Sequence, residues 1–344
     1  MNTIDKKYHA QQILVAGPAW VGDMVMAQSL FMTLKQLNPT VEIDVLAPTW
    51  SNPILARMPE VREAINLPVS HGEFGLFQRY KLGKSLRKKN YDQAIITPRS
   101  YKSALVPFFS NAKIRTGYRG EMRYGVINDI HILDKNILKQ TVQRYVALAL
   151  NDDLTQPPSV PYPKLAVNEN NIQRLISELE LNLDKPVIAL LPGAEYGEAK
   201  RWPVNYYAQL ASKLCDQGLQ VWILGSEKDY EAAATISKKN TAVNLCGKTR
   251  LEDSIDLLSV CKSAVTNDSG LMHIAAAVDI PIVAIYGSST PVYTPPLTEK
   301  ATIHYLALEC SPCFKRSCPL KHTNCLQNIT TEIIFDSVIK KINR

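Results

Sequence analysis

The sequence predicts two α/β domains, each built on a parallel sheet covered by helices. Short apolar segments rich in β-branched residues alternate with longer amphipathic segments along both halves of the chain, which is typical of strands and helices in βαβ units. Between the halves, residues 152–163 are polar and contain four prolines, which indicates a linker. We therefore expect domains over residues 1–160 and 161–329, with a cleft between them.

In the first half, apolar runs predict the strands, and apolar residues at helical spacing predict the helices. Pro39 ends the first long helix, because proline cannot continue it. The expected strands are 13–17, 41–47, 64–67, 93–97 and 114–117, and the expected helices are 24–37, 52–57, 80–89, 102–109 and 138–150.

The second half repeats the alternation, and Gly218 ends one of its helices. The expected strands are 187–191, 220–224, 242–245, 264–266 and 282–286. The expected helices are 172–181, 206–217, 229–239, 251–261, 271–278 and 333–342.

Composition indicates a globular protein whose basic charge lies in the first half. Of the 344 residues, 46% are hydrophobic, yet no run of about 18 apolar residues predicts a membrane-spanning helix. The polar N-terminus lacks the apolar core of a signal peptide, so we expect a cytoplasmic protein with reduced cysteines. Residues 1–165 contain 21 Lys and Arg against 13 Asp and Glu, whereas residues 166–344 contain 18 against 19. This asymmetry suggests an acidic partner for the first half, although a solvated surface is the commoner meaning of a modest basic excess.

Residues 265–277 combine a strand, a polar turn and a helix N-terminus. The turn residues Asn267, Asp268 and Ser269 are typical of helix caps. The free N–H groups of a helix N-terminus favour an anion, and Gly270 allows a ligand to approach the backbone. Asp268 would repel phosphate and suits hydroxyl groups instead. Phosphate together with hydroxyls describes a nucleotide sugar, although an ordinary capped helix without a ligand explains the pattern too.

Further chemistry-bearing residues follow other predicted strands, where ligands of open parallel sheets bind. Asp23 is placed to act as a general base or to cap its helix. Lys200 suits a diphosphate, or is a solvated surface lysine. Glu227 suits ribose hydroxyls or favours a helix dipole. His273 lies on the first turn of its helix, where it reaches an anion or packs structurally.

Several motifs are absent. No G-x-G-x-x-G follows the first strand and no Walker motif occurs, which disfavours a dinucleotide dehydrogenase and a P-loop enzyme. No Asp-x-Asp marks a magnesium–diphosphate bridge. We therefore expect no cofactor to be required.

Four of the seven cysteines lie within 16 residues. Their spacing, Cys310-x2-Cys313-x4-Cys318-x6-Cys325 with His322 inside, favours a structural zinc site. It matches no standard pair of C-x2-C knuckles, so a reduced thiol cluster that stabilises a loop is the alternative.

Taken together, four runs resemble glycosyltransferase family 9, the ADP-heptose:lipopolysaccharide heptosyltransferases. The resemblance spans nearly the whole chain. One departure is Glu198, where we expect proline. The four runs are 17–23 (GPAWVGD), 115–123 (RTGYRGEMR), 192–203 (PGAEYGEAKRWP) and 267–273 (NDSGLMH).

The resemblance implies the GT-B fold, two Rossmann-like domains with the acceptor on the N-terminal domain and ADP-heptose on the C-terminal one. It implies inverting transfer to heptosyl-Kdo-lipid A with Asp23 as catalytic base, and a final helix, 330–344, that joins the N-terminal domain. It also implies donor contacts, which are Lys200 to diphosphate and sugar, Glu227 to ribose, Asp268 to heptose, and Gly270 with His273 near the phosphates; Ser269 completes the turn.

The basic first half then has an anionic lipopolysaccharide core as its expected partner, rather than nucleic acid. Residues 79–89 carry six cations, with Leu82 and Leu86 at helical spacing, so this segment is expected on the inner membrane's cytoplasmic face or as an ordinary surface helix. The alternatives for function are a heptosyltransferase acting at another core position and a non-catalytic nucleotide-binding module. The cations expected to bind the acceptor are Lys102, Arg115, Arg119 and Arg123, with Arg99 beside them.

Overall fold

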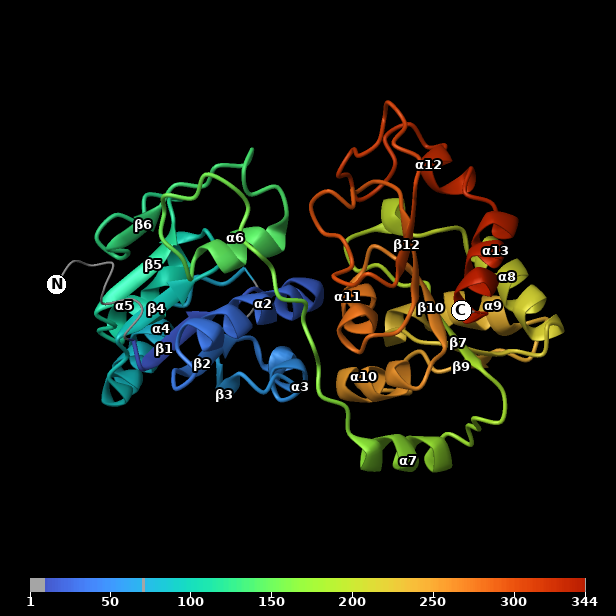
Figure 1. Cartoon of the computed structure of the whole chain (residues 1–344), viewed down its shortest axis with the longest axis horizontal. Helices are drawn as coiled ribbons and strands as arrows, with labels where there is room; N and C mark the ends of the chain where they lie inside the picture. The colour runs from blue at the N-terminus through green and yellow to red at the C-terminus, as the bar shows by residue number, and fades with distance from the viewer. Residues whose placement is uncertain (1–9, 70–71, 344) are drawn as a thin grey trace. The chain divides into compact units, whose positions relative to one another are not determined.

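The computed structural model describes residues 10–69 and 72–343. The chain divides between Pro163 and Lys164 into two compact units (Figure 1). The proline-rich segment predicts a boundary three residues earlier. Much of the polar N-terminal stretch, residues 1–9, lies outside the described residues.

The first unit is built on six parallel strands in the order β3-β2-β1-β4-β5-β6. β1 lies in the middle of the sheet, where Ala16 pairs with Leu46 on one side and Ile96 on the other. The strands are β1 (Gln12–Ala16), β2 (Glu42–Ala47), β3 (Val61–Asn66), β4 (Gln93–Ile96), β5 (Ile114–Tyr118) and β6 (Asp129–His131).

Helices connect the parallel strands from β1 to β5, as is usual for parallel pairing, whereas residues 119–128 join β5 to β6 without a helix. α2 contacts α6, and α4 contacts α5 (Figure 1). The helices are α2 (Val21–Leu37), α3 (Asn52–Leu55), α4 (Leu76–Leu86), α5 (Leu105–Phe109) and α6 (Thr141–Ala147), with short 3-10 turns η1 (Thr49–Ser51), η2 (Arg87–Lys89) and η3 (Tyr101–Ala104).

The second unit is also a six-stranded parallel sheet, in the order β12-β11-β10-β7-β8-β9. The four strands β7, β8, β10 and β11 have mostly buried side chains, which explains their apolar sequences. The strands are β7 (Val187–Leu191), β8 (Gln220–Ile223), β9 (Val243–Asn244), β10 (Ser263–Asn267), β11 (Ile282–Tyr286) and β12 (Ala301–Tyr305). The helices are α7 (Glu169–Glu178), α8 (Val204–Asp216), α9 (Tyr230–Ser237), α10 (Leu251–Ser259), α11 (Gly270–Ala277), α12 (Asn324–Gln327) and α13 (Thr331–Ile342), with 3-10 turns η4 (Glu198–Lys200) and η5 (Glu227–Asp229).

Both sheets have the Rossmann strand order. Counted within each unit, the order is 3-2-1-4-5-6, and the direction of the connections reverses between β1 and β4 and between β7 and β10. Ligands of doubly wound sheets bind beyond the carboxyl ends of the strands at such switch points. The loops at the carboxyl ends of β1, β4, β7 and β10 are therefore the candidate ligand-binding positions of the two units.

The structure differs from the sequence-based expectation at the last helix. α13 packs against α8 of the second unit, where Ile334 and Val338 share a buried cluster with Leu210 and Leu214. Residues 330–343 thus contribute to the core of the second unit, whereas the family resemblance implies that they join the first. Burial of the apolar face of α13 against α8 accounts for this placement.

Candidate active site

Lys200 and Asp268 meet at the switch point of the second sheet. Lys200 ends η4 in the loop that follows β7, and Asp268 directly follows β10. The Lys200 Nζ atom lies 2.5 Å from Asp268 Oδ2, and the two side chains are 19% and 5% exposed. The pair places a cation suited to phosphate beside a carboxylate suited to hydroxyls.

Asn267 fixes the two loops that carry this pair. Its Oδ1 atom accepts hydrogen bonds from the backbone N–H of Trp202 at 3.0 Å and from the hydroxyl of Tyr207 at 3.2 Å. Its Nδ2 atom donates to the carbonyl of Pro192 at 2.7 Å. The sequence identifies Asn267 only as capping chemistry, but the fully buried side chain holds the Lys200 loop against the carboxyl end of β10.

The predicted helix N-terminus is present at α11. Ser269 is its N-cap residue and Gly270 its first residue. The Ser269 hydroxyl makes no capping hydrogen bond; it lies 3.4 Å from the Thr266 hydroxyl. The N-terminal N–H groups of α11 therefore lack the side-chain acceptor that usually satisfies one of them, as an anion site requires.

His273 is a neutral, buried residue of α11. It is 4% exposed, and burial lowers its pKa to about 4, with Lys200 acting in the same direction and Asp268 against it. At neutral pH the imidazole therefore brings no positive charge to the site. Any contact with a phosphate would be a hydrogen bond from the neutral ring.

This burial predicts a pH dependence of stability. An unfolded histidine binds a proton near its ordinary pKa of about 6.5, whereas His273 resists protonation until about pH 4. The contribution of neutral His273 to the free energy of unfolding is complete above pH 6.5. It is lost as the pH falls towards 4, because the unfolded state then binds more protons than the folded state. Chemical denaturation across this range should give a shallower fall in the free energy of unfolding for His273→Gln than for the unmodified chain. Parallel curves would contradict a buried neutral His273.

Glu227 begins η5, directly beyond β8, the strand beside β7. Its side chain is exposed. The close approach of Gly247, where an added Cβ would lie 3.2 Å from Glu227 Cα, fixes the backbone around it. Glu227 is thus presented on a rigid turn at the same sheet edge as Lys200 and Asp268.

A second loop braces the Lys200 loop, and no pattern in the sequence indicates it. Tyr196 donates its hydroxyl to the carbonyl of Phe314 at 2.8 Å, and the N–H of Ala199 donates to the carbonyl of Arg316 at 3.0 Å. Two cations lie over the Tyr196 ring, Lys200 Nζ at 5.4 Å and Arg316 Cζ at 5.5 Å from its centroid. Exposed Glu198 begins η4 inside this braced loop, so the loop is held without the expected proline.

Two further hydroxyls at this edge are buried without partners in the described part of the chain. Ser288 and Ser289 follow β11, the neighbour of β10, and are 1% and 5% exposed. Neither hydroxyl has a hydrogen-bond partner among the described residues. An unsatisfied buried polar group is costly, and its position beyond the sheet suits ligand contact.

Asp23 lies in the first turn of α2, beyond the carboxyl end of β1. The N-cap of this helix is Trp20, so Asp23 is not the cap residue. Its Oδ1 atom accepts a hydrogen bond from the hydroxyl of Tyr145 at 2.9 Å. Burial, reinforced by the Asp23 charge, raises the pKa of Tyr145 well above its usual value, so this hydroxyl stays protonated and orients the carboxylate. No pattern in the sequence points to Tyr145, because 122 residues separate the two.

The predicted acceptor-binding cations separate into internal and exposed groups. Arg123 is 2% exposed and donates to the carbonyls of Pro98 and Tyr118, and burial lowers its pKa to about 10. Arg115 donates to the carbonyls of Val126 and Ala112. In the structure these two guanidinium groups hold loops together, and their contact with an acceptor stays a prediction.

Lys102, Arg119 and Arg99 remain closer to solvent. Lys102 is half-buried and donates to the carbonyl of Glu73 at 3.3 Å. Arg99 and Arg119 are exposed, and Arg99 donates to the Arg119 carbonyl at 3.2 Å. Both arginines follow adjacent strands, β4 and β5, at the edge where Asp23 follows β1. The exposed basic group of this edge is therefore smaller than the sequence predicts.

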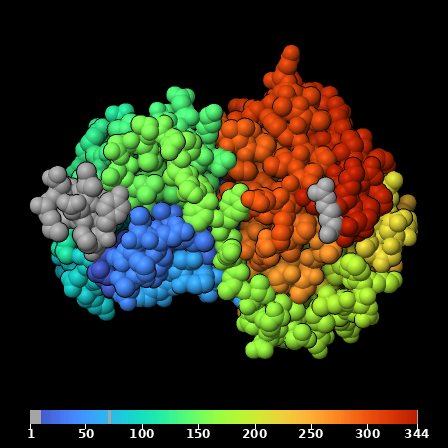
Figure 2. Space-filling model, in the orientation of Figure 1, coloured from blue at the N-terminus to red at the C-terminus, as the bar shows by residue number. Residues whose placement is uncertain are grey.

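The four clustered cysteines converge in the second unit. Cys310, Cys313, Cys318 and Cys325 line one cavity of about 20 Å³ together with His322. All are free thiols; backbone N–H groups lower the pKa of Cys318, and burial raises that of Cys325. Among the described residues, no group of three or more His, Cys, Asp or Glu side chains is arranged to hold a metal ion, so the structure does not present the predicted zinc site. Figure 2 shows this part of the chain on the surface of the second unit, in orange to red.

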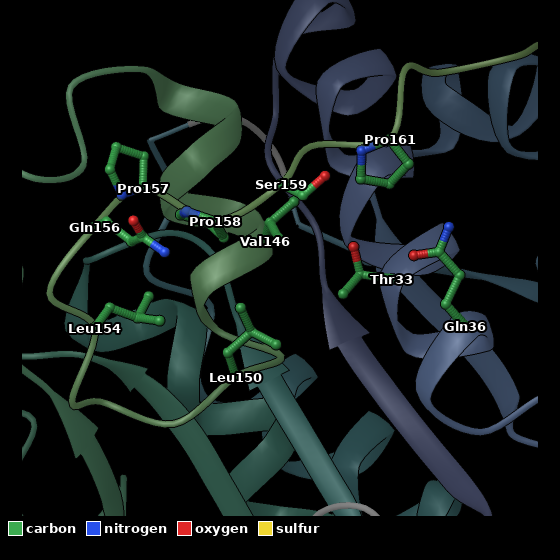
Figure 3. A pocket seen from close by; sticks show the side chains of 10 residues that line it. All are labelled: Thr33, Gln36, Val146, Leu150, Leu154, Gln156, Pro157, Pro158, Ser159 and Pro161. Atoms are coloured by element: carbon green, nitrogen blue, oxygen red, sulfur yellow. The ribbon is translucent and has the colours of Figure 1, made fainter.

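A larger cavity of about 440 Å³ lies elsewhere, in the first unit. It is lined by the carboxyl-terminal half of α2, the end of α6 and the proline-rich segment (Figure 3). It contains none of the predicted site residues. Its lining, Thr33, Gln36, Val146, Leu150, Leu154, Gln156, Pro157, Pro158, Ser159 and Pro161, has no titratable side chain that could catalyse a reaction.

Comparisons with known proteins identify the family of the chain. The sequence model of glycosyltransferase family 9 (heptosyltransferase) matches residues 79–324. Lipopolysaccharide heptosyltransferase 2 of Salmonella typhimurium is 50% identical over 305 residues, covering 85% of this chain and 87% of that protein. The Escherichia coli protein of that name is 48% identical with the same coverage. The solved structure of E. coli ADP-heptose LPS heptosyltransferase II superposes with a TM-score of 0.86 at 42% identity, covering 96% of this chain and 98% of that one.

Two Rossmann-type units and the match to the E. coli heptosyltransferase II structure define a glycosyltransferase of the GT-B fold. Within that class, the chain belongs to glycosyltransferase family 9, the heptosyltransferases.

Proposed function

We propose that this protein transfers L-glycero-D-manno-heptose from ADP-heptose to the first heptose of the lipopolysaccharide inner core, on heptosyl-Kdo-lipid A. The observation that carries the proposal is the Lys200–Asp268 pair at the β7/β10 switch point. Its neighbourhood provides groups for the diphosphate, the heptose and the ribose of a nucleotide sugar. The heptosyltransferases 2 of S. typhimurium and E. coli, at about half identity over most of the chain, support the choice of sugar and acceptor.

In this proposal the second unit binds the donor. Lys200 and the α11 N-terminus, with Gly270 at its start, hold the diphosphate, because a fixed cation and free N–H groups both stabilise negative charge. Asp268 accepts hydrogen bonds from heptose hydroxyls, the Ser269 hydroxyl accepts from or donates to them, and Glu227 accepts hydrogen bonds from the ribose hydroxyls. His273 supports the phosphates as a neutral hydrogen-bonding group.

The first unit provides the base. Asp23 takes the proton from an acceptor hydroxyl, and that oxygen attacks the anomeric carbon of the heptose from the face opposite ADP. The bond to the ADP oxygen breaks in the same displacement, so the configuration inverts. Negative charge develops on the leaving ADP, where Lys200 and the α11 N-terminus stabilise it more strongly than in the ground state.

Acceptor recognition is assigned to the cations near the carboxyl edge of the first sheet. Arg99, Arg119 and Lys102 are the residues proposed to contact phosphates and carboxylates of the core. No helix among the described residues is long and apolar enough to cross a membrane. The proposed location is the cytoplasm, with peripheral contact to the inner membrane that holds the acceptor.

The reaction is expected to proceed without a dissociable metal. Lys200 and the α11 N-terminus occupy the role that a divalent cation has in other nucleotide-sugar enzymes, so EDTA should leave the initial rate nearly unchanged. The measurement is ADP release with and without EDTA, with the melting temperature followed in parallel to report any metal bound by the cysteine cluster. Loss of activity at an unchanged melting temperature, restored by Mg²⁺, would contradict this expectation.

An acceptor panel tests the function against its nearest alternative. Kdo-lipid A, heptosyl-Kdo-lipid A and a core already carrying two heptoses are offered with ADP-heptose, and product masses are compared. The proposal expects heptosyl-Kdo-lipid A to gain one heptose fastest. Preference for another acceptor would assign the protein to a different core position, and ADP binding without transfer would leave a non-catalytic module.

A further inference from the structure

One surface of the first unit combines exposed apolar and cationic side chains on a single helix. We call it the α4 surface. Its apolar end exposes Phe74 (49%), Leu76 (51%), Phe77 (73%) and Tyr80 (40%). Its cationic end comprises the exposed residues Lys81, Lys84, Arg87 and Lys88, which continue along α4 and η2.

The opposite face of α4 is firmly packed, so the exposed side chains do not belong to an unfilled core. Arg79 is 4% exposed and donates to the carbonyls of Phe74 at 2.7 Å and Lys102 at 3.1 Å. Gly83 lies so close to α5 that an added Cβ would be 2.5 Å from Phe109 Cβ. The helix is therefore locked on α5 and η3 with its outer face directed to solvent.

The structure also revises which cations of residues 79–89 are available. Arg79 is internal, and Lys89 pairs with Asp44 and Glu63. The four exposed cations have no acidic neighbour in their own segment, because residues 76–89 contain no Asp or Glu. Phe77, Lys81, Lys84 and Lys88 follow each other at i, i+4, i+7 and i+11, which places them along one face of the helix.

We propose that the α4 surface docks the protein onto an anionic lipid bilayer. Exposed Phe and Leu side chains enter the boundary between headgroups and acyl chains, and lysines beside them attract anionic headgroups. A second copy of this chain fits less well, because a symmetric contact would bury four cations of each copy, and residues 76–89 contain no Asp or Glu to pair with them. The inference rests on the proposed function only in taking the acceptor to be carried by a lipid.

The test is co-sedimentation of the full chain with phosphatidylcholine vesicles, with and without phosphatidylglycerol. The unmodified protein should bind the anionic vesicles, bind neutral ones weakly, and detach as salt is raised. Lys81→Glu with Lys84→Glu should lower the affinity at least about tenfold, since each cation near the surface contributes. Leu76→Ala with Phe77→Ala should also lower the affinity for anionic vesicles. Its remaining binding should depend on salt more strongly than that of the lysine variant, because its cations are intact.

Matched controls lie on the second unit. Lys238→Glu with Lys239→Glu makes the same charge change on an exposed pair, and Leu183→Ala shortens a leucine that is 47% exposed. Both should bind as the unmodified chain does, and unchanged melting temperatures establish that all variants fold. Equal binding by α4 and control variants, or equal binding to neutral vesicles, would overturn the proposal. Failure of the unmodified chain to bind would overturn it too, and a dimer lost only in the α4 variants would assign the surface to a second copy.

Transfer assays separate this inference from the proposed function. With a deacylated acceptor in solution, the α4 variants should keep their rate; with acceptor in anionic vesicles, they should lose it. Vesicle binding without heptose transfer by the unmodified chain would refute the function and leave the docking surface intact. Heptose transfer without vesicle binding would refute the docking surface and leave the proposed function intact.

Discussion

Asp23→Asn is expected to lower kcat by about 10²–10⁴, the usual effect of removing a general base, while ADP affinity stays unchanged. The amide cannot accept a proton near neutral pH, although it keeps the size of the side chain and can still accept the hydrogen bond from Tyr145. The donor residues belong to the second unit, so ADP should bind normally. The measurements are kcat from ADP release and ADP affinity by calorimetry.

Tyr145→Phe is the matched control for this variant. It removes the hydroxyl that orients Asp23 but keeps the base, so the loss in kcat should be clearly smaller. A near-normal kcat for Asp23→Asn would show that the carboxylate is structural. A parallel loss of ADP affinity would place Asp23 in the donor site instead.

Lys200→Met is expected to weaken ADP binding and to lower kcat by about 10²–10³, as for other groups that stabilise developing negative charge. The methionine keeps the length of the side chain without its charge. The same change leaves the buried Asp268 carboxylate without its ion-pair partner. Breaking a buried ion pair in this way destabilises a fold by about 3–5 kcal/mol. Melting temperature must therefore be recorded beside kcat and ADP affinity.

Two further variants separate charge from folding. Lys200→Met combined with Asp268→Asn also removes the unpaired Asp268 charge, so the stability should recover while the activity stays low. Lys228→Met alters an exposed lysine of the same unit that pairs with Glu195, and should leave kcat and affinity unchanged. Full activity in the double variant would refute the role of Lys200 on the diphosphate.

The central strands could be predicted because burial on both faces makes them short apolar runs. β7 and β11, for example, match the expected ranges 187–191 and 282–286. Two of the edge strands, β6 and β12, could not be predicted in this way. β6 is Asp129-Ile-His131, and β12 is only half-buried, so neither has the apolar pattern of a core strand. α4 begins at Leu76 rather than residue 80, because its first turn exposes apolar residues that an amphipathic pattern would not place there.

In the candidate site, the sequence could indicate which residues follow strands, but not which residues far apart in the chain contact them. The motif residues Asp23, Lys200 and Asp268 do follow strands at the switch points. Their contacts with Tyr145 and with each other depend on residues far apart in the chain. Arg123 shows a different limit: this basic motif position is buried and hydrogen-bonded within the first unit, and charge alone does not predict that burial.

The most direct test of the account is transfer itself. Purified protein is incubated with ADP-heptose and heptosyl-Kdo-lipid A, and ADP, product mass and the anomeric configuration of the new linkage are measured together. The proposed mechanism predicts one ADP released for each heptose gained by the acceptor, with the configuration inverted relative to the donor. Retention of configuration, or ADP release without a heavier acceptor, would contradict it.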